Sequence, residues 1–354
     1  MTGRRVFLLL AAGLIVIAFA VWVSSHRHLE HASLAGDLVL PGLEGALNTV
    51  SEVKLTRGDG THATLSRGDA GWLVAERGYP ADSGRVRKLL LDLGAMNVVE
   101  EKTRDPANYG ALGVEDVANP KASGTRIDLV TPQRSFALLV GKSSNAKSGF
   151  VRLVGAAQTF LAAPLVSVES DPKRWLDHAL LDIASERVQG FEVTPLEGPA
   201  YSASRERADQ ADFKVSGVPK GRSLASPGAA GPIAGGLAGL NLDDVRKKAA
   251  ASAGRQAHAR FRTFDGLELR LEGSKDDAHA WLTVNVAPAA TTPAPGDAAH
   301  AEAERLQGRL KDWEFEVPTY RYDQIFRPLE ELLQKPPEKG AKKQPKAPEP
   351  ATSR

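Results

Sequence analysis

Paired acidic residues are the side chains in this sequence whose type and spacing could support catalysis. Hydrolysis of a glycosidic bond uses two carboxyl groups, one as an acid and the other as a base or nucleophile. Such pairs stand at Glu100-Glu101, Glu115-Asp116, Asp243-Asp244 and Asp276-Asp277. Each pair adjoins a predicted turn or helix end, where acidic residues are common. We therefore assign no catalytic residue to them.

Two other short patterns resemble catalytic or binding signatures. Gly141-Lys142-Ser143 has the form of the end of a phosphate-binding loop, but Phe136 stands where that loop needs its first glycine. Asp177 beside His178 resembles a base with its orienting group. Neighbours on a helix point about 100° apart, however, and the chain has no serine-elbow signature. We expect a strand end at the first pattern and a surface polar pair at the second.

Metal and cofactor sites are not predicted either. His26, His28 and His31 could ligate zinc or copper, but no carboxylate or thiolate set accompanies them at a structural-site spacing. We therefore interpret these histidines as solvated polar residues of a tether and not as metal ligands. The absence of cysteine excludes disulfides, thiolate metal sites and a cysteine nucleophile. The sequence thus predicts no catalytic, cofactor-binding or metal-binding residue, and we expect the protein not to be an enzyme.

The uncharged apolar run at residues 6–23 determines on which side of the membrane the rest of the chain is expected to lie. At about 1.5 Å per residue, a helix over this run just crosses a hydrocarbon core. Arg4 and Arg5 precede it, and this basic bias predicts a single inner-membrane span with a cytoplasmic N-terminus and a periplasmic remainder. A cleaved signal peptide is the alternative, because Ala18-Phe19-Ala20 has the form of a processing site. Both interpretations export the rest of the chain.

Composition limits the size of the exported part and its partners. The chain has 354 residues, of which 42% are hydrophobic and 25% charged, as in a folded protein long enough for two domains. Lys and Arg number 45 against 43 Asp and Glu, which gives a formal net charge of +2. This balance creates no strong overall field, so nucleic acid is not an expected partner.

The first half of the exported region has the pattern of an α+β domain. Alternating apolar and polar residues at 53–65 predict a hairpin, and Trp72-Leu73-Val74 predicts a third strand. Asp82 is placed to cap a helix whose apolar residues, from Val86 to Met96, recur at helical spacing. Further strands are expected at residues 126–130, 135–140, 150–154 and 160–161.

The second half repeats this order. Ser226-Pro227 has the form of a helix N-cap followed by proline in the first turn, and Asp265-Gly266 marks a tight hairpin turn. The corresponding strands are expected at residues 188–193, 212–215, 281–286 and 315–317. An internal duplication of a β-β-α-β-β unit therefore explains the length of the chain.

Each copy of the unit is expected to end in a packed helix, at residues 172–184 and 322–334, and a short charged helix is expected at 298–311. The tail is rich in lysine and proline and is expected to be disordered, because it cannot build a core. The expected organisation is an N-terminus and transmembrane anchor at 1–25, a tether at 26–49, α+β lobes at 50–186 and 187–334, and the tail at 335–354.

A further set of segments is distinguished by its aromatic residues and glycines. These are Trp72, the run from Tyr79 to Asp82 with its helix, Tyr109 to Gly113, the strand ending at Gly141, Phe150 to Arg152, Trp175 to Leu181, and Trp313 to Phe315 with Pro318 to Tyr320. Together they resemble the bacterial domain-of-unknown-function family DUF4340 over about residues 50–333. The resemblance implies an extracytoplasmic domain on a single membrane anchor, often encoded beside an ABC transporter of the gliding-motility type. It implies no established chemistry.

Two functions of different classes are consistent with these observations. The first is a non-enzymatic, membrane-anchored accessory protein that binds an ABC transporter permease or a related envelope protein. The alternative is an envelope hydrolase or carbohydrate-binding protein with an unrecognised carboxylate site. An aromatic-lined cleft with converging carboxylates would favour the alternative, whereas a broad apolar groove between the lobes would favour the first.

The charge bias around residues 6–23 predicts that residues 36–354 lie outside the inner membrane. Single cysteines replacing Ser33 and Ser353 should therefore react with a membrane-impermeant thiol reagent once only the outer membrane is permeabilised. The unchanged chain has no cysteine and is the matched control. Labelling that requires disruption of the inner membrane would contradict the predicted orientation.

Overall fold

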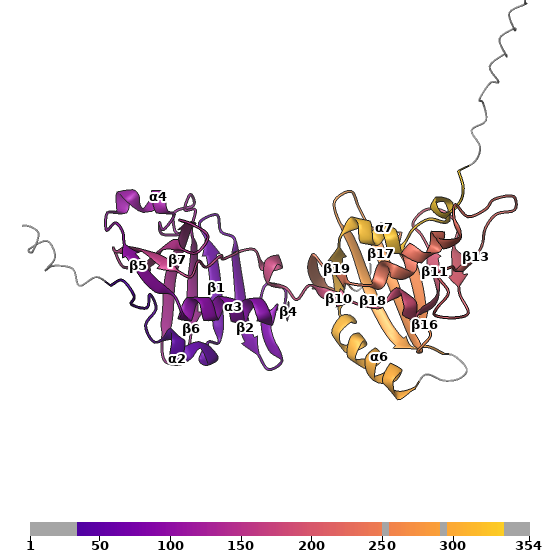
Figure 1. The fold of residues 1–354 in the computed structure, drawn as a ribbon, viewed down its shortest axis with the longest axis horizontal. Helices are drawn as coiled ribbons and strands as arrows, with labels where there is room; N and C mark the ends of the chain where they lie inside the picture. The colour runs from indigo at the N-terminus through magenta and orange to yellow at the C-terminus, as the bar shows by residue number, and fades with distance from the viewer. Residues whose placement is uncertain (1–33, 250–254, 291–295, 336–354) are drawn as a thin grey trace, which may run out of the picture. The chain divides into compact units, whose positions relative to one another are not determined.

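The computed structural model of the protein describes residues 34–249, 255–290 and 296–335 (Figure 1). The predicted membrane span at 6–23, the three tether histidines and all but the first residue of the predicted tail lie outside the described residues. Within the described residues, no helix has the length and apolar character needed to cross a membrane. The chain divides into two compact units, which meet in sequence between Asp177 and His178.

The fold is α+β and rich in sheet, in agreement with the class predicted from the sequence. Unit 1 has a nine-stranded sheet with the order β4-β3-β2-β1-β6-β7-β8-β9-β5, in which neighbours run antiparallel. Its strands are β1 (Glu52–Arg57), β2 (His62–Gly68), β3 (Gly71–Val74), β4 (Tyr79–Pro80), β5 (Asn97–Glu101), β6 (Thr125–Val130), β7 (Ser135–Ser143), β8 (Gly149–Leu153) and β9 (Thr159–Ala163). Its helices are α2 (Leu43–Ala46), α3 (Ser83–Gly94) and α4 (Tyr109–Leu112), with short 3-10 turns at Leu47–Thr49 and Pro106–Asn108.

Helix α3 begins where the sequence predicts. The Asp82 carboxylate accepts a hydrogen bond from the Arg85 backbone N–H at 3.0 Å and so caps the helix. The buried side chains of the helix form one stripe, made of Val86, Leu89, Leu90 and Leu93. Burying one such side chain contributes about 1.5–3 kcal/mol. This stripe therefore holds α3 on the sheet, which it crosses in Figure 1.

The other face of the unit 1 sheet is partly covered by the loop that contains α4 (Tyr109–Leu112). Arg152 of β8 follows a core residue, so its side chain points to this face. Its guanidinium lies 4.4 Å from the centre of the Tyr109 ring, and its Nε donates to the Val114 carbonyl at 2.9 Å. The loop approaches the strand so closely that a Cβ at Gly141 would collide with the loop backbone. The segment from Tyr109 to Gly113 thus covers part of this face of the sheet and has a structural role.

Unit 2 has an eight-stranded antiparallel sheet with the order β13-β12-β11-β16-β17-β18-β19-β15 and a separate two-stranded ladder of β10 and β14. Its strands are β10 (Ala179–Leu181), β11 (Val188–Thr194), β12 (Tyr201–Ser204), β13 (Lys214–Ser216), β14 (Leu240–Asn241), β15 (Asp244–Lys247), β16 (Ala257–Thr263), β17 (Leu267–Lys275), β18 (Ala280–Pro288) and β19 (Trp313–Val317). Read along the chain, β11, β12, β13, β15 and β16 to β19 take the sheet positions that β1, β2, β3, β5 and β6 to β9 take in unit 1.

The last segment of unit 1 is hydrogen-bonded to the segment that precedes α3. The Asp82 N–H donates to the Trp175 carbonyl at 2.8 Å. Two residues further on, the Asp177 N–H donates to the Pro80 carbonyl at 2.9 Å. Trp175 is only 1% exposed, so the connection is buried. These bonds tie the end of the unit to the start of its helix.

Unit 2 is closed by the same pair of bonds. The Ala225 N–H donates to the Leu332 carbonyl at 2.8 Å, and the Gln334 N–H donates to the Ser223 carbonyl at 2.9 Å. Leu332 is as buried as Trp175, at 1% exposed. In both units the closing segment reaches the residues just before the helical region.

The helix predicted at residues 172–184 is wrong. Pro172 opens a 3-10 turn, Pro172–Trp175, after which Leu176 is extended and forms an isolated bridge with Ala81. Strand β10 follows. The large apolar residues of the segment are buried, as expected, but Leu176 is extended opposite Ala81, and the Asp177 N–H donates to Pro80 instead of to a helix carbonyl.

The helix predicted at residues 322–334 is interrupted. It consists of α7 (Thr319–Ile325) and a 3-10 turn at Leu329–Leu332, separated by Pro328. Proline has no N–H and clashes with the preceding turn, so a helix cannot pass through it.

The helix predicted to begin at Ser226 is three short pieces rather than one helix. They are a 3-10 turn at Pro227–Ala230, α5 (Gly231–Ala234) and a 3-10 turn at Gly235–Leu237, and the Ser226 side chain forms no capping hydrogen bond. Each glycine inside a helix costs about 1 kcal/mol relative to alanine. A Cβ at Gly236 would lie 2.8 Å from Cγ1 of Ile325, so close packing favours glycine there.

The charged helix predicted at residues 298–311 is confirmed as α6 (Asp297–Leu310). It packs against β18 through its buried residues, Ala299, Ala303, Leu306 and Leu310.

Trp175 should be a major source of stability for unit 1. Its ring is 1% exposed, its indole N–H donates to the Glu169 carbonyl at 2.7 Å, and the Arg85 guanidinium lies 4.9 Å from the ring centre. Trp175→Ala in the full chain purified in detergent should lower the free energy of unfolding by about 3–5 kcal/mol. Tyr320→Ala is the control, because Tyr320 is 67% exposed and should matter little. Equal melting temperatures for the two variants would contradict a core role for Trp175.

Candidate functional site

The four acidic pairs singled out in the sequence take part in local structural bonds. Glu100 lies on β5 and pairs with Lys102 at 2.7 Å. Asp116, Asp244 and Asp276 each accept a hydrogen bond from a nearby backbone N–H, at 3.0, 2.8 and 2.7 Å respectively. Among the described residues, no group of three or more His, Asp or Glu side chains is arranged to hold a metal ion.

Lys142 and His178 also bond to backbone carbonyls. The Lys142 ammonium donates to the carbonyls of Gly110 and Ala111 at 3.2 and 3.1 Å, so it satisfies the end of α4. Nδ1 of His178 lies 2.7 Å from the Leu242 carbonyl oxygen, which fits a hydrogen bond donated by the imidazole. Both residues have a structural partner where they lie.

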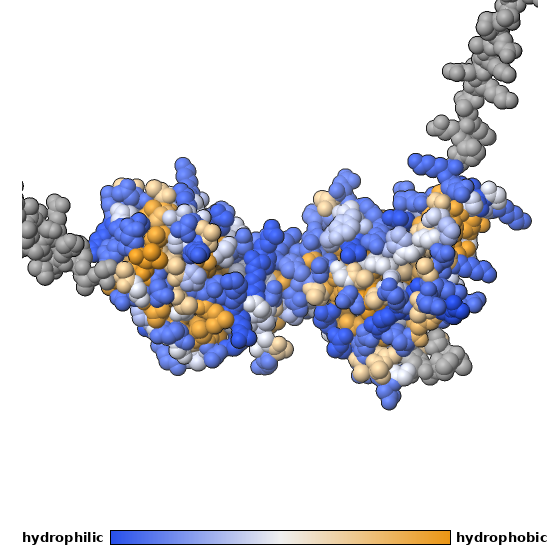
Figure 2. Space-filling model, viewed as in Figure 1, coloured by the Kyte–Doolittle hydropathy of each residue, from blue (hydrophilic) through white to orange (hydrophobic). Residues whose placement is uncertain are grey.

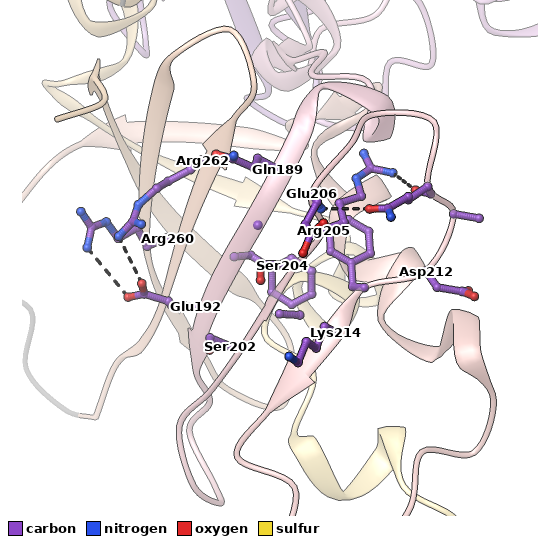
Figure 3. A pocket seen from close by; sticks show the side chains of 16 residues that line it. Gln189, Glu192, Ser202, Ser204, Arg205, Glu206, Asp212, Lys214, Arg260 and Arg262 are labelled. Carbon is purple, nitrogen blue, oxygen red and sulfur yellow. Dashed lines mark hydrogen bonds and ion pairs between the residues drawn. The ribbon is translucent and has the colours of Figure 1, made fainter. Parts of the chain in front are cut away.

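A groove of about 1160 Å³ lies on unit 2 over strands β11, β12 and β16 (Figure 3). Ser202 and Ser204 of β12 lie along it, and Arg260 and Arg262 of β16 line one side. The connection from β12 to β13, residues 205–213, lines the other side. Sequence reasoning did not single out this groove.

Strand alternation places the two arginines in the groove. Ala259 and Phe261 of β16 are 3% and 0% exposed and face the core. Arg260 and Arg262 alternate with them and therefore point to the opposite face of the sheet. Phe191, which lines the groove, is itself 2% exposed, so it offers no open ring for stacking.

Glu268 of β17 is the centre of an ion-pair cluster beside the groove. Its carboxylate accepts hydrogen bonds from Nη2 of Arg260 at 2.6 Å and from Nε of Arg270 at 2.8 Å, and Nε of Arg262 lies 3.6 Å away. The Glu268 side chain is only 6% exposed. Burial by itself raises the pKa of Glu268, but the hydrogen bonds from Arg260 and Arg270 outweigh burial and lower the pKa below its ordinary value.

Glu192 of β11 is a second, looser partner of the same arginines. Its carboxylate lies 3.3 Å from Nη2 of Arg262 and 3.9 Å from Nη1 of Arg260, and its side chain is 54% exposed. The three arginines thus face one buried and one exposed carboxylate. Exposed ion pairs of this length contribute little to stability, so Glu192 binds the arginines more weakly than Glu268 does.

Arg205 fixes the connection that forms the far wall. Its guanidinium donates to the carbonyls of Val188, Ser185 and Gln210 at 2.9, 2.6 and 2.6 Å, and it lies 4.6 Å from the centre of the Phe213 ring. Arg205 is 9% exposed, so its guanidinium stabilises the wall and is not open to a ligand.

The groove has the chemistry of a binding site for a polar or anionic group. Arginine stays protonated in proteins and presents N–H donors, so Arg260 and Arg262 suit anion binding and not acid–base catalysis. Neither an open aromatic platform nor a broad apolar surface lines this groove. Its signal in the sequence is the alternation Arg260-Phe261-Arg262 and Glu268-Leu269-Arg270 on the two strands of a predicted hairpin.

Apolar side chains elsewhere on the described surface are scattered. The large exposed ones are Leu34, Leu91, Val99, Val130 and Tyr320. Figure 2 shows hydrophobic patches separated by hydrophilic residues on the visible face of each unit.

The Glu268 carboxylate should make the stability of unit 2 depend on acidity. Its pKa is lowered on folding from 4.5, so its contribution is fully present above about pH 4.5 and is lost as the pH falls through the lower folded value. Glu268→Gln should reduce the free energy of unfolding at pH 7 by about 1 kcal/mol, because the arginines that lose this partner are 35–65% exposed and stay solvated. Asp209→Asn, which alters an exposed pair, is the control. Identical unfolding curves for wild type and Glu268→Gln at pH 7 would contradict this assignment.

Comparison with known proteins gives a family and no closer relative. The family model described as Domain of unknown function (DUF4340) matches residues 72–258, which is more than half of the 354 residues. The match runs from β3 to β16 and includes one wall of the groove. No curated protein and no solved structure matches the chain. The chain belongs to the DUF4340 family.

Proposed function

We propose that the protein is a membrane-anchored, extracytoplasmic accessory subunit of an ABC transport system that acts by binding. In this proposal residues 6–23 span the inner membrane once, the N-terminus is cytoplasmic and the two units are periplasmic. The partners are the membrane and an ABC transporter permease or a related envelope protein, and nucleic acid is not among them. Family membership supports this proposal, and so does the uncharged run at residues 6–23 with Arg4 and Arg5 directly before it.

We also infer that the two units arose by internal duplication. The inference is supported by the matching strand orders and by the matching closing hydrogen bonds of the two units. An arginine also donates to a carbonyl near the first strand in each unit: the exposed Arg67 donates to the Val50 carbonyl at 3.4 Å, and the buried Arg205 donates to the Val188 carbonyl at 2.9 Å. Duplicated units provide two related surfaces, of which one can specialise in binding.

The observation that carries the binding proposal is the groove of unit 2. Its lining residues present N–H donors, hydroxyls and carboxylates, and its arginines contact the exposed carboxylate of Glu192. Such a surface suits reversible recognition of a polar partner. The acidic pairs of the sequence, by contrast, are bonded within turns and strands.

Co-purification from native membranes tests the proposed function. The full-length tagged chain should retain a membrane subunit of an ABC transporter, and replacing residues 6–23 by an unrelated span should largely preserve this, since a lone helix in lipid gives little specificity. Deleting residues 188–334 should abolish it.

Carboxylate variants separate binding from catalysis. Glu206→Gln and Asp212→Asn change the acidic groups of the groove wall that could act as acid or base. Both variants should support full complementation of a deletion strain. A folded variant that still co-purifies with the transporter but fails to complement would overturn the non-enzymatic proposal.

A further inference from the structure

Two features of unit 2 depart from unit 1, and they meet at the groove. Strand pairing gives the comparison, because Lys54 pairs with Asp128 in unit 1 as Glu192 pairs with Arg260 in unit 2. By the same register, Arg262 stands where unit 1 has Val130. The shared strand framework therefore does not require arginines at these positions.

The second departure is the wall of the groove. In unit 1 the strands β2 and β3 are joined by a tight turn, since Gly68 pairs with Gly71. In unit 2 the connection from β12 to β13 is longer and is fixed by Arg205. The Gln210 side chain adds to this, since it accepts hydrogen bonds from the N–H groups of Glu206 and Arg207 at 2.9 and 3.1 Å. The connection that forms the wall is therefore fixed by its own hydrogen bonds.

The charge of the groove favours an anion. The lining carries four cationic side chains, Arg205, Lys214, Arg260 and Arg262, against three carboxylates, Glu192, Glu206 and Asp212, which leaves one positive charge in excess. Arg260 and Arg262 are 35% and 41% exposed, so they keep N–H groups open to the groove. Arginine binds carboxylate and phosphate oxygens through paired N–H donors.

Glu192 acts as a replaceable internal anion. It lies farther from Arg260 than Glu268 does, at 3.9 Å against 2.6 Å, and it is far more exposed. A ligand oxyanion arriving between Arg260 and Arg262 would take over the contacts that Glu192 makes, while Glu268 keeps the arginines in position from below. The hydroxyls of Ser202 and Ser204 lie across the groove as further donors.

We propose that this groove is a binding site for an oxyanion group, a carboxylate or a phosphate, held by Arg260 and Arg262. The inference rests on the proposed binding function and names the chemistry of the ligand. Binding displaces Glu192 from the arginines and weakens as ionic strength rises, because both charges are partly exposed.

Calorimetric titration of the full chain in detergent tests the site, with citrate and inorganic phosphate as separate probes. Arg262→Gln should weaken binding of the preferred probe on the order of 10-fold, the size of one charge-assisted hydrogen bond. Glu192→Gln should tighten binding several-fold, because it removes the internal competitor. Arg126→Gln is the matched control, since Arg126 forms an ion pair with Asp128 at 2.7 Å on the unit 1 sheet.

The two probes identify the source of the oxyanion. Binding of citrate alone indicates a carboxylate ligand, and binding of phosphate alone indicates a phosphate ligand; either result supports the site. Arg262 is chosen because it lies 3.6 Å from Glu268 and is a weaker structural partner than Arg260. Absence of binding by both probes, or equal weakening by Arg126→Gln, would overturn the proposal. If anion binding fails while co-purification persists, only this site is wrong; if co-purification alone fails, only the proposed function is wrong.

Discussion

The backbone hydrogen bonds that close each unit are the constraint on which its architecture depends. A helical region on one face of a sheet is held by apolar contacts, but its position along the sheet needs a directional bond. In unit 1 the N–H of Asp82, which also caps α3 with its side chain, supplies this bond to Trp175. In unit 2 Ala225 supplies it to Leu332, although the helical region there is a series of short pieces. Both units have these closing bonds, whereas only unit 1 has a continuous helix at this place.

Local patterns predicted the parts of the fold whose causes are local. Alternation at 53–65 predicts β1 and β2, and Asp82 with the stripe from Val86 to Met96 predicts α3. The errors occur where a distant partner decides the backbone. Leu176 lies in an apolar segment with helix-like spacing, yet it lies opposite Ala81 in a bridge whose bonds are made by its neighbours Trp175 and Asp177, which no local pattern reveals. Proline at 328 was a visible signal that the predicted helix would be interrupted.

The candidate site was only half visible in the sequence. Alternation within a predicted hairpin places Arg260, Arg262 and Arg270 on one face, so their clustering follows from a period of two. That Glu268 is buried beneath them depends on side-chain packing across two strands, and the groove wall depends on how Arg205 bonds to three carbonyls. The acidic pairs attracted attention because adjacency is easy to see, whereas their bonds to nearby N–H groups are not.

Closure by the last segment also sets when each unit can complete its fold during synthesis of the chain. The bonds from Asp82 and Asp177 require the chain up to Asp177, and they require nothing beyond it. Unit 1 therefore lacks these closing bonds until nearly all of its own residues have been synthesised, and it can then close while unit 2 is still incomplete. Unit 2 waits in the same way for Gln334, close to the end of the chain. Synthesis from the N-terminus thus completes the closing segment of unit 1 before that of unit 2.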